Sequence, residues 1–194
     1  MPRKPVYIDA FTTYHTTSQC IDKKLLMKHN GMKAIFLRQI RRALKKYDFE
    51  IISFAIEDNH FHLTIRTLND FDTISVIMQF IKSRFAEIYN KRMNRTGPFW
   101  NGRYKAKVID LSKKPDLHCL RHIWYQGYNS VKSGKVRDPR KYKYNSIRAY
   151  LEKDFISLLP ITLHKAFVEL GESFNERVKV FLNFEKAYKL KYRL

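Results

Sequence analysis

The chain has 194 residues, of which 44% are hydrophobic and 14% aromatic, so it can build a packed core and is not expected to be disordered. Its 38 Lys and Arg against 18 Asp and Glu give a formal net charge of +20, which predicts an extended anionic partner, nucleic acid before a membrane surface. No apolar run of about 18 residues is present, so we expect no membrane span and no secretory leader. Two distant cysteines argue against a disulfide framework or a zinc cluster and favour a cytoplasmic protein.

Hydrophobic periodicity predicts an alternation of strands and helices. The stretch 6–17 is rich in β-branched and aromatic residues, whereas 25–47 carries apolar residues at helical spacing. The polar Glu57-Asp58-Asn59 connection suggests a hairpin between two short strands. In chain order we expect a strand over 6–17, a helix over 25–47, strands over 50–56 and 59–66, a helix over 73–95, a strand over 99–110, a helix over 116–130, and two helical stretches in the tail after 156.

This order is typical of an α+β protein. Strands joined by a hairpin and by crossover helices favour a ferredoxin-like sandwich, in which helices cover a mostly antiparallel sheet. We expect one domain over residues 1–151 and a C-terminal helical extension over 152–194.

A pair of histidines stands out in the segment DNHFHLTI, which covers residues 58–65. Side chains at i and i+2 of a strand share one face, so His60 and His62 project together while Phe61 points to the other side. Two imidazoles on one face can bind a divalent metal. They can equally be structural, and the spacing alone leaves both interpretations open.

A metal-free alternative uses two His-x-Thr patterns on different predicted strands. These are His15-Thr16-Thr17 and His62-Leu63-Thr64. Facing one cleft, they would resemble the machinery of 2H-type RNA phosphoesterases, where each His is an acid or base and each Thr holds a phosphate. Patterns of three residues recur by chance, so the signal has low specificity.

Five segments, the first of which holds the histidine pair itself, favour the metal-binding interpretation. In order, they read NHFHL, QFIKSRFAEIYNKR, GPFWNGRYKAKVI, LRHIWYQGYNSVKSGKV and YNSIRAYL. Together they resemble the IS200-type HUH single-tyrosine (Y1) transposases, and most closely the REP-associated tyrosine transposases. The similarity spans residues 6–151, and 156–188 is more loosely similar to their C-terminal extension. It implies that residues 1–151 are the catalytic domain.

The resemblance also implies the roles of four residues. His60, His62 and Asn129 correspond to the metal ligands, with Mg²⁺ or Mn²⁺ as cofactor. Tyr125 corresponds to the nucleophile, with Tyr128 as a competitor. The family's Asn-Pro is Asn129-Ser130 here, and Glu57-Asp58 stands where Met-Pro is usual, but neither departure removes a catalytic group.

The implied activity is DNA transposition. A single-strand endonuclease and strand-transferase would cleave hairpin-associated single-stranded DNA through a 5′-phosphotyrosine link. Basic and aromatic residues between the His pair and the tyrosine are candidates for DNA binding, because phosphate contacts and base stacking hold single strands. These candidates are Lys82, Arg84, Lys91, Arg92, Arg95, Trp100, Arg103, Tyr104 and Lys105.

Three further expectations follow from the resemblance. The protein would act in the bacterial cytoplasm, associated with the nucleoid. It would be a monomer or a homodimer, with the monomer favoured. A catalytically silent module that only binds DNA hairpins is the main alternative to the enzyme.

Overall fold

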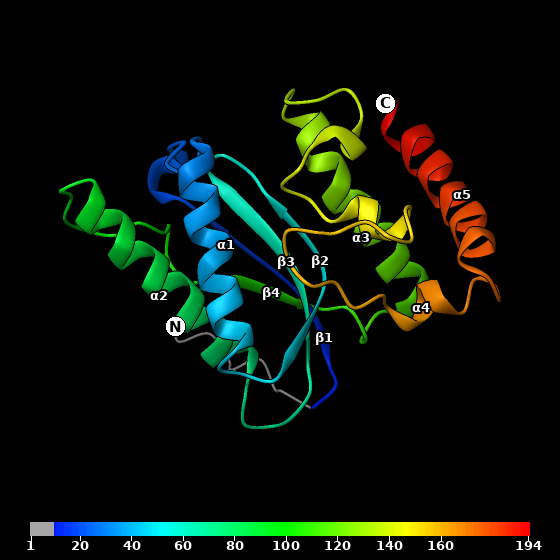
Figure 1. The fold of residues 1–194 in the computed structure, drawn as a ribbon, viewed down its shortest axis with the longest axis horizontal. Helices are drawn as coiled ribbons and strands as arrows, with labels where there is room; N and C mark the ends of the chain where they lie inside the picture. The colour runs from blue at the N-terminus through cyan, green and yellow to red at the C-terminus, as the bar shows by residue number, and fades with distance from the viewer. Residues whose placement is uncertain (1–9) are drawn as a thin grey trace.

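The computed structural model describes residues 10–194, in which a four-stranded sheet lies between two groups of helices (Figure 1). The strands are β1 (Thr13–Gln19), β2 (Phe49–Ile56), β3 (His60–Thr67) and β4 (Lys105–Val108). The α-helices are α1 (Asn30–Leu44), α2 (Ile74–Arg92), α3 (Pro115–Lys132), α4 (Lys165–Val168) and α5 (Phe174–Tyr192). Short 3₁₀ turns occur at Ile21–Lys23, Pro139–Lys141 and Ile147–Tyr150.

The sheet has the ferredoxin-like topology. Its strand order is β2-β3-β1-β4, and every neighbouring pair is antiparallel. The β2–β3 hairpin and the crossover helices α1 and α2 generate this order. The expected α+β sandwich is therefore confirmed.

The two faces of the sheet belong to different cores. Phe61, Leu63 and Ile65 of β3 are fully buried and pack with residues of α1 and α2. A second core joins α3 to α4 and α5 on the opposite face. Figure 1 shows α1 and α2 on one side of the sheet and α3, α4 and α5 on the other. Strand alternation thus turns the intervening His60 and His62 toward α3.

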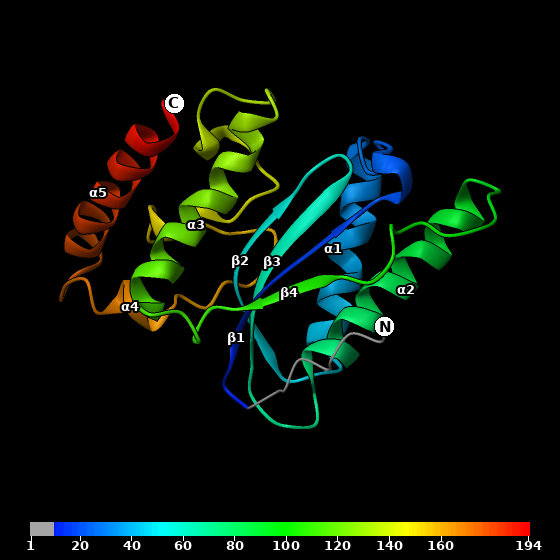
Figure 2. The same cartoon turned by 180° about the vertical axis from the view of Figure 1, so that it is seen from behind.

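Helix α5 lies alongside α3 and runs in the same direction, as both views show (Figure 2). Trp124 of α3 stacks on Phe181 of α5 at 4.9 Å between ring centroids, and its indole nitrogen donates to the Phe181 carbonyl. One helical turn further along both helices, the Tyr128 hydroxyl meets Glu185. The expected C-terminal extension is therefore packed directly on α3.

Three expected elements differ from the structure. The predicted strand over 99–110 shortens to β4, because Phe99 and Trp100 leave the strand and pack in the core, and Gly102 turns the chain at φ 76°. The helix predicted from residue 25 begins at Asn30. The predicted first strand begins at Thr13, and its portion over 6–9 lies outside the described residues. Within residues 10–194, no helix is both long and apolar enough to cross a membrane.

Candidate active site

The histidine pair lies in the centre of the sheet, opposite β1. Cross-strand partners are Thr17 for His62 and Gln19 for His60. His15 comes from the same face of β1, and its Nε2 lies 2.9 Å from Nδ1 of His62. The His60 and His62 rings are 5.0 Å apart between centroids. Five side chains of two neighbouring strands therefore lie together on the face toward α3.

Hydrogen bonds fix both imidazoles in the same way. Nδ1 of His60 donates to Oδ1 of Asn59 at 2.7 Å, and Asn59 is itself oriented by donating to the Lys23 carbonyl. Nδ1 of His62 is hydrogen-bonded to Nε2 of His15, and in the tautomer in which Nδ1 is the donor, the lone pair of His62 lies on Nε2. In each ring, Nε2 is the nitrogen left for another partner. Such outer hydrogen bonds set the tautomer and orientation of metal-binding histidines.

The site keeps its imidazoles neutral. Burial is the largest cause that lowers the pKa of His60, with Lys135 adding to it. Burial and then the neighbouring His15 and His60 lower the pKa of His62 well below its ordinary value. A neutral imidazole has the lone pair that metal binding requires.

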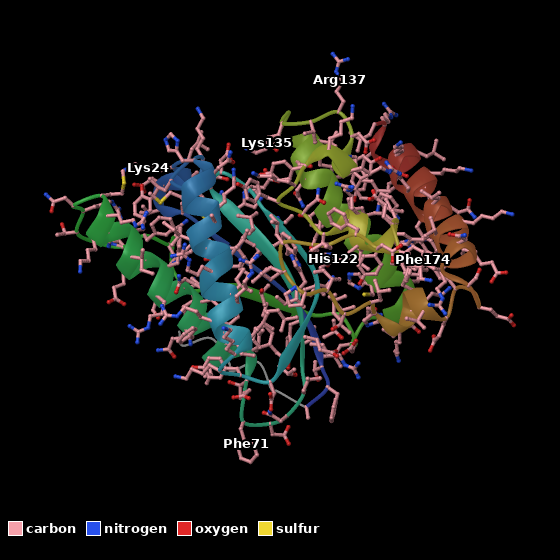
Figure 3. All side chains as sticks on the ribbon, in the orientation of Figure 1. Lys24, Phe71, His122, Lys135, Arg137 and Phe174 are labelled. Carbon is pink, nitrogen blue, oxygen red and sulfur yellow. The ribbon has the colours of Figure 1, made fainter. Side chains whose placement is uncertain are left out.

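Helix α3 brings a tyrosine and an asparagine to the histidines. Tyr125 and Asn129 are one turn apart and are half-buried among otherwise buried neighbours. Their helix is fixed to the sheet by the buried Gln126, whose Nε2 donates to Thr64 Oγ1 at 2.7 Å and lies 3.1 Å from His122 Nε2. His122, labelled in Figure 3, also packs on His15 at 4.0 Å between ring centroids.

A second attachment holds the C-terminal end of α3. The Ser133 hydroxyl donates to Glu57 at 3.2 Å, and Lys135 forms an ion pair with Asp58, which also pairs with Lys33 at 2.5 Å. Lys135 reaches this turn from the loop after α3 (Figure 3). The unusual Glu57-Asp58 therefore positions α3, and the Asp58 carboxylate is occupied by two lysines.

These elements enclose a cavity of about 280 Å³, here called the site pocket. The Tyr125 ring meets the His62 ring edge-on at 5.6 Å between centroids. The residues that line the pocket are Thr17, Ser18, Gln19, His60, His62, Asn101, Arg103, Lys105, Tyr125 and Asn129. The structure thus brings the four expected catalytic and metal-binding residues to one cavity.

The competing Tyr128 has a different environment. Its side chain is 2% exposed, and its hydroxyl donates to Oε1 of Glu185 at 2.6 Å. Burial and then this hydrogen bond raise its pKa far above the ordinary value. Burial alone would raise the pKa of Glu185, yet hydrogen bonds from Arg140 and Tyr128 hold it below its ordinary value. Tyr128 therefore belongs to the contact between α3 and α5.

The donor atoms of the site pocket fit a divalent cation. No group of three His, Cys, Asp or Glu side chains in the described part of the chain is arranged to hold a metal. A third donor beside the two histidines would therefore have to be of another kind. Asn129 uses its Nδ2 to donate to the Tyr125 carbonyl at 3.0 Å, so its Oδ1 is the oxygen atom that could serve a cation in the pocket that both histidines line.

Comparison with known families agrees with this arrangement. The family model described as transposase IS200 like matches residues 11–118, more than half of the chain. The chain belongs to the IS200-like transposase family. The match includes His60 and His62 and ends before Tyr125 and Asn129. No curated protein sequence matches this transposase significantly.

One solved structure supports the fold of the transposase. A REP-associated tyrosine transposase bound to a REP hairpin superposes with a TM-score of 0.62 at 18% identity, over 86% of this chain and 96% of that one. A candidate transposase from Deinococcus radiodurans R1 gives a TM-score of 0.41 at 15% identity, over 65% of this chain and 96% of that one.

The seven basic residues of the transposase that were predicted to bind DNA divide into three groups. Arg103 and Lys105 line the site pocket. Lys82 and Arg95 are occupied in holding the loop after α2, Lys82 by donating to the Gly102 carbonyl and Arg95 by donating to the Pro98 carbonyl. Burial lowers the pKa of Lys82 to about 8. The remaining three, Arg84, Lys91 and Arg92, are exposed on α2, across the sheet from the site pocket.

The two aromatic candidates are both engaged within the protein. Trp100 is 8% exposed, packs against Phe99 at 4.6 Å and donates its indole N–H to the Lys82 carbonyl. Trp100 therefore exposes little ring surface on which a base could stack, and its role in DNA binding stays a prediction. Tyr104 is half-buried, and its hydroxyl lies 3.0 Å from that of Ser75.

Sequence reasoning missed the supporting residues of the site. His15 appeared only in the metal-free alternative, and Gln126 was not considered. A usable signal was present, because Gln126 is a polar residue between apolar neighbours of a predicted helix. The contact between His15 and His62 depends on the register of β1 against β3, which cannot be derived from the sequence alone.

Proposed function

We propose that the transposase is a metal-dependent single-strand DNA endonuclease and strand-transferase that uses Tyr125 as its nucleophile. The observation that carries this proposal is the site pocket, where Tyr125 and Asn129 of α3 meet His60 and His62 of β3. Family membership supports DNA transposition as the overall role. The hairpin bound by the REP-associated relative supports hairpin-associated single-stranded DNA as the substrate class.

The chemistry follows from the residues of the pocket. The Tyr125 phenol oxygen attacks the phosphorus of one phosphodiester and gives up its proton to solvent, the bond from phosphorus to O3′ breaks, and the leaving O3′ takes up a proton from solvent. The products are a 5′-phosphotyrosine and a free 3′-hydroxyl. The covalent link conserves the bond energy, so attack by another 3′-hydroxyl can rejoin the DNA without a nucleotide cofactor.

Other residues prepare the phosphate for attack. His60, His62 and Asn129 would hold Mg²⁺ or Mn²⁺, which when bound polarises the scissile phosphate and stabilises developing charge. Arg103 and Lys105 line the same pocket and neutralise neighbouring phosphates. Because one chain supplies all these groups, the proposal favours a monomer as the active form. The proposed place of action is cellular DNA in the cytoplasm.

The metal-free phosphoesterase alternative agrees poorly with this geometry. It needs Thr64 in the cleft, but Thr64 is fully buried and accepts a hydrogen bond from Gln126. His15 and His62 also contact each other directly at 2.9 Å and do not flank an open cleft.

The decisive experiment is detection of a covalent adduct. Labelled hairpin oligonucleotides with single-stranded flanks are incubated with protein and Mn²⁺, then separated on a denaturing gel. We expect an adduct with the wild type that disappears with EDTA and with Tyr125→Phe, while Tyr125→Phe retains DNA binding. An adduct that persists in Tyr125→Phe assigns the nucleophile elsewhere. Binding without an adduct in any divalent metal supports the silent DNA-binding module instead.

A further inference from the structure

A second cavity lies on the other side of Tyr125, between β4, α3 and α5. It has a volume of about 500 Å³ and is here called the α5 groove. Its basic residues are Lys107 of β4, Arg121 of α3 and Lys191 of α5. The catalytic proposal above uses none of these three.

Tyr125 lines both cavities, so the α5 groove and the site pocket adjoin at this side chain. A DNA strand with its scissile phosphate beside Tyr125 must continue away from the pocket on both sides of that phosphate. The groove provides a path for one of these two segments.

The charge of the groove suits a phosphate backbone. Lys107, Arg121 and Lys191 are all exposed, and none forms an ion pair with a carboxylate of residues 10–194. No Asp or Glu of the described chain lines the cavity. Unpaired cations without nearby carboxylates are available to bind anions.

Besides its basic residues, the α5 groove has an aromatic surface. Phe184, Tyr188 and Tyr192 recur at every fourth residue on one face of α5, and all three line the cavity. Tyr192 is 42% exposed and rests on Tyr188 at 4.6 Å between ring centroids, while Nζ of Lys132 lies 3.9 Å from its ring centroid. An exposed ring beside cations is the combination that binds unpaired bases, because paired bases bury their faces within the duplex stack.

We propose that the α5 groove binds the single-stranded DNA segment adjoining the cleaved phosphate. A base stacks on Tyr192, and phosphates contact Lys107, Arg121 and Lys191. This inference rests on the proposed function, since it places the scissile phosphate at Tyr125. It gives the C-terminal extension a direct part in substrate binding.

The test compares hairpins with and without flanks in a protein that cannot cleave. Fluorescence anisotropy measures binding by Tyr125→Phe protein of a blunt hairpin and of the same hairpin with a 5′ or a 3′ oligo-dT flank of about eight nucleotides. Arg121→Gln with Lys191→Gln removes two groove cations. Arg38→Gln with Lys45→Gln is the matched control, since both residues are exposed on or next to α1, across the sheet.

We expect the groove variant to lose affinity for one flanked hairpin, with the slope of log affinity against log salt reduced by about 1.4, or about 0.7 for each lost phosphate contact. Tyr192→Ala should weaken the same complex at least about fivefold. The blunt hairpin and the control variant should be unaffected. Equal losses on blunt and flanked hairpins, or no loss on either flank, would overturn the proposal. Because only binding is measured, absence of a covalent adduct in the wild type would refute the proposed chemistry separately.

Discussion

At the scale of single residues, the hydrogen bond between His15 and His62 is predicted to strengthen metal binding. It occupies Nδ1 of His62 at 2.9 Å and leaves Nε2 for a ligand. We expect His15→Ala to weaken Mn²⁺ binding by about 10- to 100-fold, because the His62 ring loses its fixed orientation. His15→Gln, which keeps a hydrogen-bonding group, should recover part of the affinity.

This expectation is checked by calorimetric titration of the DNA-free protein with Mn²⁺. His118→Ala is the matched control, since His118 contacts His122 at 6.2 Å between ring centroids and no ligand residue. An unchanged dissociation constant in His15→Ala would show that His15 only fills space.

The sequence predicted part of this site for a clear physical reason. Strand alternation alone places His60 and His62 on one face, and helical spacing alone aligns Tyr125 with Asn129. His15 lies 47 residues from His62 in sequence, so its role depends on strand register. Residue type does not reveal the surroundings of a side chain: Lys82 was predicted from its charge to bind DNA, and in the structure it is buried and donates to a backbone carbonyl.

At the scale of secondary structure, α3 presents two tyrosines to two different surroundings. Tyr125 faces the site pocket, whereas Tyr128 donates to Glu185 of α5. We expect Tyr128→Phe to lower the free energy of unfolding by about 1.5–3 kcal/mol, the usual value of a hydrogen bond to a charged group. It should still form the covalent DNA adduct.

Urea denaturation and the adduct assay on the same protein samples separate the two roles. Tyr125→Phe is the matched variant, with the opposite expected pattern of normal stability and no adduct. If the Tyr128→Phe protein is stable but forms no adduct, Tyr128 and not Tyr125 would be assigned as the nucleophile.

Secondary structure itself was predicted well where apolar periodicity is regular, as in β2, β3 and α2. It was predicted poorly over 99–110, because aromatic residues favour a strand by type. Phe99 and Trp100 serve instead as core residues of an irregular loop. The attachment of α5 to α3 was also beyond the sequence, since an amphipathic helix does not indicate which surface it covers.

At the scale of the whole molecule, the buried histidines predict a loss of stability in mild acid. Burial is the main cause that lowers the pKa of His15 to about 4 and that of His122 well below its ordinary value. The unfolded chain titrates its histidines near 6.5 and so binds more protons than the folded protein between pH 6.5 and about 4. The free energy of unfolding should therefore decrease as the pH is lowered through this window, by up to about 1.4 kcal/mol per pH unit for each such histidine.

Urea denaturation of the metal-free protein between pH 7.5 and 4.5 measures this slope. We expect His122→Gln to reduce the slope of the free energy of unfolding against pH by up to about 1.4 kcal/mol per pH unit, the contribution of one histidine. The glutamine side chain takes up no proton on unfolding. Comparing slopes, and not absolute stabilities, removes any pH-independent cost of the substitution. Lys107 also lowers the pKa of His122, so Lys107→Gln should flatten the slope slightly in the same direction. Parallel curves for wild type and His122→Gln would mean that His122 binds protons equally in the folded and unfolded protein, which contradicts a lowered pKa.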